Sequence, residues 1–135
     1  MKIVSIIIPT YNRDKKLIKR ALVSVLKQTY QNFEIILVDD NINSDISNDV
    51  KKLVDELNDK RIKYIKNKQN IGGAKSRNKA IKIAKGDYIT FLDDDDFYLK
   101  DKLKKQVDYL ENNEFNFVIS NLVIVLSLIH IWRCR

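Results

Sequence analysis

The stretch FEIILVDD, residues 33 to 40, is a run of apolar and β-branched side chains that ends in two aspartates. A run of this kind, without polar-apolar alternation, is typical of a strand buried on both faces of a sheet. VSIII, residues 4 to 8, has the same character and is followed directly by Pro9. Residues 61 to 67 alternate and predict a more exposed strand, and DYITFL, residues 87 to 92, predicts a fourth.

Helical periodicity separates these strands, because apolar residues recur there at spacings of three and four. The expected helices cover 14–26 with Asp14 as N-cap, 47–57 with Ser47 or Asn48 as N-cap, 72–85 with Gly86 as C-cap, and 100–112. FNFVIS, residues 115 to 120, predicts a fifth strand. Strands that alternate with helices predict an α/β fold, with a mostly parallel sheet and helices on both faces.

Polar residues follow the predicted strands at the points where they end. They are Pro9, Thr10, Tyr11 and Asn12 after the first strand, Asp39 and Asp40 after the second, and Asp93 to Asp96 after the fourth. In open parallel sheets, ligands bind outside the carboxyl ends of the strands. We therefore expect these residues to gather at one edge of the sheet and to form the functional site.

The four consecutive aspartates, Asp93 to Asp96, create an electrostatic problem if they lie in a sheltered cleft. Two unit charges 4 Å apart interact by roughly 4 kcal/mol at an effective dielectric of about 20. Carboxylates without histidine or cysteine ligands suit Mg²⁺ or Mn²⁺, which bridge protein carboxylates to substrate phosphates. The alternative is a solvated acidic loop before a helix, where the helix dipole favours acids.

The pair Gly72-Gly73 matches neither the dinucleotide fingerprint nor the P-loop, so it indicates a tight turn before a helix. Arg77 lies about one turn into that helix. It can face the ligand edge and meet an anion, or it can be a solvated surface residue.

The composition is that of a globular domain, with 44% apolar and 32% charged residues. The net charge is +7, but lysines alternate with acids and no basic stripe carries interleaved aromatics, so we expect no nucleic-acid partner. A single cysteine, Cys134, excludes an internal disulfide and fits a reducing compartment. The first residues lack the features of a secretory signal, and we therefore expect a cytoplasmic location.

Four segments, VSIIIPTYNR, FEIILVDDN, NIGGAKSRNKAI and GDYITFLDDDDFY, resemble the N-terminal half of family 2 glycosyltransferases in their order and spacing. This resemblance implies a Rossmann-like GT-A fold, here as a partial domain, and an inverting, metal-dependent enzyme of bacterial polysaccharide biosynthesis. Such an enzyme transfers a sugar from a nucleotide-diphosphate sugar, most often a UDP-sugar, to an acceptor hydroxyl. The expected cofactor is Mg²⁺ or Mn²⁺.

The resemblance also assigns roles to single residues. Pro9, Thr10 and Tyr11 would line the base pocket, Asp39 would hydrogen-bond the base, and Asp40 would support the site. Gly73 and Arg77 would close over the nucleotide. The listed acidic positions then follow as substrate contacts at Asp93 and Asp94 and metal ligands at Asp93 and Asp95, with Asp96 the least certain of the run.

The domain expectation is a nucleotide-sugar-binding half over 1–121 and an apolar tail over 122–135 that is not native to the family. The string LSLIHIWRCR is similar to translated sequencing-adapter read-through, and the apolar run within the tail is too short for a membrane span. The family's general base lies in a C-terminal half, so we expect little or no transfer by this chain. Peripheral membrane association is expected of a full-length enzyme.

Two alternatives place acidic residues at strand ends in other ways. An aspartate-nucleophile phosphatase carries its D-x-D pair on the first strand, whereas Asp95 and Asp96 here follow the fourth. A receiver-like, non-enzymatic signalling domain with a Mg²⁺ pocket needs an acidic pair after the first strand, where this chain has Asn12-Arg13.

Overall fold

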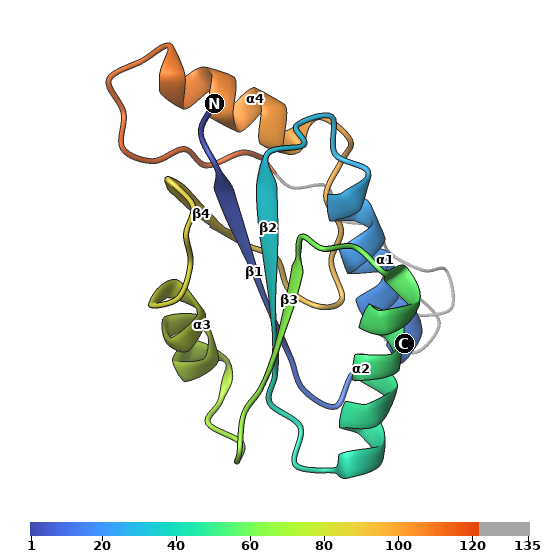
Figure 1. Cartoon of the computed structure of the whole chain (residues 1–135). Coiled ribbons are helices and arrows are strands. Elements are labelled where there is room, and N and C mark those ends of the chain that lie inside the picture. Colours follow the sequence, from blue (N-terminus) through green and yellow to red (C-terminus); the bar gives the residue numbers. More distant parts are fainter. Residues whose placement is uncertain (122–135) are drawn as a thin grey trace, which may run out of the picture.

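The computed structural model describes residues 1–121 as four strands and four helices in alternation (Figure 1). In chain order they are β1 (Val4–Thr10), α1 (Lys15–Leu26), β2 (Phe33–Asp39), α2 (Ser44–Leu57), β3 (Ile62–Lys66), α3 (Gly73–Ile81), β4 (Tyr88–Phe91) and α4 (Lys102–Glu111). The predicted α/β class and parallel sheet are confirmed.

The sheet has the strand order β3-β2-β1-β4, and all of its pairings are parallel. In the register, Thr10 lies beside Asp39, and Asp39 lies beside Lys66. Thus the carboxyl ends of three strands meet at one edge. β1 and β2 occupy the centre and are almost wholly buried, in agreement with their uninterrupted apolar runs.

Helices cover both faces of the sheet, with α3 on one side and α1 and α2 on the other (Figure 1). The larger core contains buried side chains from the α1, α2 and α4 helices together with Ile6, Ile8, Ile35 and Leu37 of the central strands. The smaller core, under α3, contains alternate residues of the same strands. Successive strand residues point to opposite faces, so both central strands are anchored on two sides.

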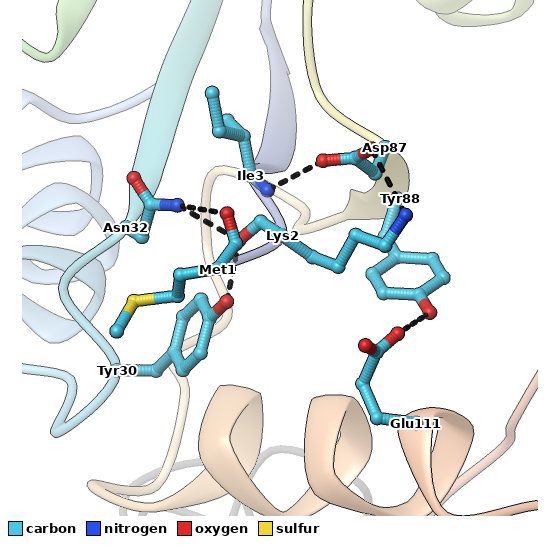
Figure 2. Close-up of polar contacts among 8 residues, drawn as sticks. All are labelled: Met1, Lys2, Ile3, Tyr30, Asn32, Asp87, Tyr88 and Glu111. Carbon is cyan, nitrogen blue, oxygen red and sulfur yellow. Dashed lines mark hydrogen bonds and ion pairs between the residues drawn. The ribbon is translucent and has the colours of Figure 1, made fainter.

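The amino end of the sheet is held by a group of polar contacts (Figure 2). The backbone N–H of Ile3 donates to Asp87 Oδ2 at 2.8 Å, which ties the start of β1 to the start of β4. The Asn32 side-chain amide donates to the carbonyls of Met1 and Lys2 at 2.9 and 3.0 Å, immediately before β2. These contacts lie opposite the carboxyl edge, and so they hold the three strands together without occupying the candidate site.

The helix boundaries confirm one predicted cap and correct two others. Asp14 caps α1, because its side chain accepts a hydrogen bond from the Lys16 N–H. Asn43, rather than Ser47 or Asn48, caps α2, accepting from the N–H groups of the next two helical residues but one. Packing decides this choice, since Ser47 is buried inside the helix.

Gly86 is not a helix C-cap, because α3 ends at Ile81 with Lys82 as its cap residue. A Cβ atom on Gly86 would lie 2.6 Å from the backbone nitrogen of Ser5. The Gly86 N–H also donates to Ser5 Oγ at 2.9 Å. This glycine therefore permits the close approach of the β4 entrance to β1, which is a packing requirement that local sequence does not reveal.

The predicted fifth strand over 115–120 is wrong, since this segment forms no strand. Its alternating apolar side chains are instead exposed, with Phe117 and Ile119 at 76% and 84%. Alternation favours an extended backbone, but a strand also needs a partner edge, and β4 does not pair with this segment. The predicted tail, 122–135, lies outside the described residues. Within residues 1–121, no helix is long and apolar enough to cross a membrane.

Candidate functional site

A pocket of about 300 Å³ lies at the carboxyl edge of the sheet, where the loops after β1, β2 and β4 meet the start of α3. It is lined by Pro9, Thr10, Tyr11, Arg13, Asp40, Gly73, Arg77, Asp93, Asp94 and Asp95. The structure thus brings together all the expected site residues except Asp39. Arg13 is an addition that the sequence analysis missed.

Asp40 is a buried carboxylate that fixes the loop leading into α3. Its Oδ1 accepts from Asn67 Nδ2 and from the Ile71 N–H, each at 2.9 Å, and its Oδ2 accepts from the Gly72 N–H at 2.8 Å. Gly72 has a φ of +82°, a conformation that other residues adopt only with strain. Asp40 and Gly72 together therefore set the position at which α3 begins, beside the pocket.

Asp39 lies beneath the pocket with no exposed surface. Its Oδ1 accepts from the backbone and side-chain N–H groups of Asn41 at 2.9 and 2.7 Å, and its Oδ2 accepts from the Tyr64 hydroxyl at 2.6 Å. Burial and the bond to Asp39 raise the pKa of Tyr64, so the phenol remains a donor. Contact between Asp39 and a base stays a prediction, and it would require one of these partners to move.

Two arginines neutralise the acidic run. Arg77 Nη2 lies 2.6 Å from Asp93 Oδ1, while Arg13 bridges Asp94 and Asp95, with Nε 2.9 Å from one carboxylate and Nη2 3.0 Å from the other. The electrostatic cost of the adjacent acids is thus reduced by cations that the chain itself supplies. Asp96 is exposed and does not line the pocket, so the D-x-D register Asp93-x-Asp95 is the one that faces it.

Arg13 links the loop after β1 to the loop after β4 across a separation of 81 residues. Burial acts to lower its pKa, but the hydrogen bond to Asp94 and the charges of the three neighbouring aspartates outweigh this and raise the pKa. The guanidinium is therefore a permanent cation at the wall of the pocket. The available sequence signal was its place directly after a strand end, opposite an unbalanced acidic run.

Thr10 carries a hydroxyl that points to an absent ligand. Its Oγ1 is buried and has no hydrogen-bond partner among residues 1–121. An unsatisfied buried polar group costs about 1–3 kcal/mol, so such groups are rare and mark places where another molecule binds. Because Thr10 lines the pocket, its hydroxyl is available to a polar ligand there.

The remaining lining residues shape the pocket entrance. Tyr11 is 54% exposed and offers an aromatic surface beside the strand end. A Cβ atom on Gly73 would lie 3.2 Å from Nη1 of Arg77, so the glycine leaves room for the guanidinium to lie back over the first turn of α3. The first N–H groups of that helix have no intrahelical acceptors and favour anions.

A divalent cation fits the chemistry of this site only if the ligand supplies part of the coordination. Within the described part of the chain, no three acidic, histidine or cysteine side chains converge as a preformed metal centre. Mg²⁺ and Mn²⁺ nevertheless bind commonly through one or two carboxylates together with substrate phosphates. Asp93 and Asp95 provide two such carboxylates at the pocket wall.

Comparison with known proteins places the chain among the glycosyltransferases. The model of the family Glycosyl transferase family 2 matches residues 5–132. An Escherichia coli protein named UDP-Glc:alpha-D-GlcNAc-diphosphoundecaprenol beta-1,3-glucosyltransferase WfgD is 40% identical over 123 residues, which is 91% of this chain and 47% of that protein.

Two solved structures share the fold, which is the GT-A fold. S. aureus TarS in complex with UDP-GlcNAc superposes with a TM-score of 0.71 at 32% identity, covering 84% of this chain and 32% of that one. The mannosyltransferase PcManGT from Pyrobaculum calidifontis, in complex with GDP-Man and Mn²⁺, gives 0.70 at 25% identity, covering 79% and 32%.

The chain spans less than half of the length of the relatives that it matches, from 38% of a Methanocaldococcus jannaschii glycosyltransferase to the 47% of WfgD. These matches do not favour the phosphatase or receiver alternatives, whose acidic residues follow the first strand rather than β4. With the family model covering nearly the whole chain and the strand-end pocket in place, this chain belongs to glycosyl transferase family 2.

Proposed function

We propose that residues 1–121 form the donor-binding part of an inverting glycosyltransferase that takes its sugar from a nucleotide-diphosphate sugar. The observation that carries this proposal is the pocket at the carboxyl edge, which combines an unpartnered buried hydroxyl, two arginines and three aspartates. A nucleotide diphosphate is an anion that needs both cationic partners and, through a metal ion, carboxylates. The pocket offers this mixed set of charges.

The nucleoside would lie against Pro9, Thr10 and Tyr11, with the Thr10 hydroxyl as a hydrogen-bond partner. Arg77 would turn from Asp93 toward the diphosphate, and Gly73 leaves the space for that movement. Asp40 would act indirectly by holding the start of α3. A UDP-sugar is the proposed donor, since TarS and WfgD are both named with UDP-linked sugars.

Asp93 and Asp95 would hold Mg²⁺ or Mn²⁺, which when bound supplies stabilisation of the charge that develops on the departing diphosphate. In the reaction, the acceptor oxygen bonds to the anomeric carbon from the face opposite the diphosphate, and the bond from that carbon to the diphosphate breaks. The hydroxyl proton passes to a general base, to which we assign no residue. The donor-binding step is therefore the part of the activity that we assign here.

The proposed setting is the cytoplasmic face of a membrane, where the protein would associate peripherally. WfgD is named for a diphosphoundecaprenol acceptor, and a net charge of +7 favours an anionic membrane surface. A lipid-linked acceptor in bacterial polysaccharide synthesis is consistent with both.

Calorimetric titration with UDP, GDP and TDP, with and without Mn²⁺, tests the proposal. We expect binding of one nucleotide that strengthens with Mn²⁺ and loses this dependence in Asp95→Ala. Asp55→Ala on the exposed side of α2 is the control and should bind as the wild type does. A folded sample that binds none of the three nucleotides would contradict the proposed function.

A further inference from the structure

Helix α1 carries a row of polar side chains that faces the acidic loop. Arg20, Ser24 and Gln28 follow one another at intervals of four residues, and therefore lie along one side of the helix and its last turn. Arg20 donates to the carbonyl oxygen of Asp95, and Ser24 Oγ accepts from the Tyr98 N–H at 3.0 Å. The row thus contacts the main chain of the segment that follows the aspartates.

Gln28 makes the strongest connection in this row. It is 1% exposed, and its Nε2 donates to the carbonyl oxygen of Leu99 at 2.8 Å while its Oε1 accepts from the Leu103 N–H at 3.0 Å. Leu103 is the second residue of α4, whose first N–H groups lack intrahelical acceptors. The N-cap residue of α4, Asp101, provides no side-chain cap. Gln28 therefore caps α4 from another helix.

The acidic loop is consequently held at both ends. At its start, the Leu92 N–H donates to the Ile7 carbonyl at 3.1 Å, which extends the pairing of β4 with β1. At its other end, Thr29 adds to the contacts of Gln28, its N–H donating to the Lys100 carbonyl at 3.0 Å. Between these points the aspartates face the pocket.

Burial of apolar side chains does not fix this loop. Phe97 and Leu99, its two large apolar residues after the aspartates, are 39% and 61% exposed. The hydrogen bonds to α1 are therefore what determines the path of the main chain between β4 and α4. Displacing reacting groups by about 1 Å can reduce the rate of an enzyme roughly 100-fold, so such a path is functionally important.

We propose that Ser24 and Gln28 are positioning residues that place the carboxylates of Asp93 and Asp95 for a metal-bound diphosphate. This inference rests on the proposed function, because it concerns the same pocket. Neither residue lines that pocket, so both act through the main chain of the loop.

Two substitutions and two controls test the role of the row. Gln28→Met keeps the length of the side chain and removes both bonds, while Ser24→Ala removes the hydroxyl and Ser24→Thr retains it. Leu53→Ala, in the core under α2, destabilises the fold away from the loop. Each variant is titrated with the nucleotide that the wild type binds, with and without Mn²⁺, and its backbone amide exchange is measured without ligand.

We expect Gln28→Met and Ser24→Ala to reduce the Mn²⁺-dependent gain in nucleotide affinity by about tenfold, with metal-free affinity within about twofold of the wild type. Amide exchange over 96–103 should accelerate by about tenfold in both, and remain slow in β1 and β2. Ser24→Thr should behave as the wild type, and Leu53→Ala should lower the melting temperature while keeping the Mn²⁺ gain.

Two results would overturn the inference in distinguishable ways. A wild-type Mn²⁺ gain that both loop variants retain removes the positioning role and leaves the proposed function intact. A wild type that binds no nucleotide, or binds it without any effect of Mn²⁺, removes the proposed function and the positioning role together.

Discussion

Replacing Asp40 by asparagine should destabilise the protein although the side chain keeps its shape. An amide can direct its one oxygen toward Asn67 and Ile71, but its NH₂ group then faces the N–H of Gly72, and two donors meet where the wild type has a 2.8 Å bond. Asp40 is 2% exposed, so water does not restore the lost bond. Hydrogen bonds to charged groups contribute about 1.5–3 kcal/mol each, and the two retained bonds are weakened as well.

The expected loss in the free energy of unfolding is therefore about 2–4 kcal/mol, measured by urea denaturation followed by circular dichroism. Since urea slopes for small domains are about 1–3 kcal/mol/M, the midpoint should fall by roughly 1–2 M. Asp55→Asn removes the same charge from an exposed position on α2 and should stay within about 0.5 kcal/mol of the wild type. If Asp40→Asn were as stable as this control, the clamp on the start of α3 would be refuted.

Three further outcomes follow from the ionisable groups. The raised pKa of Tyr64 means that stability present below about pH 10 is lost at higher pH, where the unfolded chain releases a proton that the folded state keeps. Tyr64→Phe should remove that alkaline loss, and should lower stability at pH 7 by about 1–3 kcal/mol because Asp39 loses a donor, as a pH series of urea titrations will show. The hydrogen bond from Arg61 lowers the pKa of Asp59 to about 2, so its contribution is present above about pH 4 and disappears as the pH falls to 2. Asp59→Asn should thus cost about 1–2 kcal/mol at pH 7 and nothing near pH 2, and an equal cost at both values would contradict the assignment. Arg77→Ala should strengthen the binding of Mn²⁺ alone by about two- to fivefold, measured by calorimetry, because an aspartate loses its half-exposed cation; unchanged or weaker Mn²⁺ binding would contradict this.

Features written in short stretches of sequence were predictable. The buried runs of β1 and β2, the Asp14 cap and the aspartates after β4 are local signals, and the parallel topology follows from their alternation with helices. The gathering of strand-end residues around one pocket was predictable for the same reason.

Features decided by distant contacts were not predictable. Several residues between 41 and 48 can cap a helix, and the burial of Ser47 selects Asn43. Gly86 looked like a helix end because the close approach to Ser5 is visible only in three dimensions. The segment 115–120 has the alternation of a strand but finds no partner edge.

The same reason explains what was missed at the site. Arg13 meets its aspartates across most of the chain length, so no spacing rule could pair them. The position of Asp39 beneath the pocket depends on the Tyr64 hydroxyl, which comes from the neighbouring strand β3.

The contacts from α1 to the acidic loop have a consequence for how this site can change over generations. Arg20, Ser24 and Gln28 bond to main-chain atoms, which every amino acid possesses. Side chains of the loop, such as the exposed Leu99, can therefore be exchanged while the loop keeps its path. A lineage can in this way alter what surrounds a donor sugar without redesigning the support beneath it.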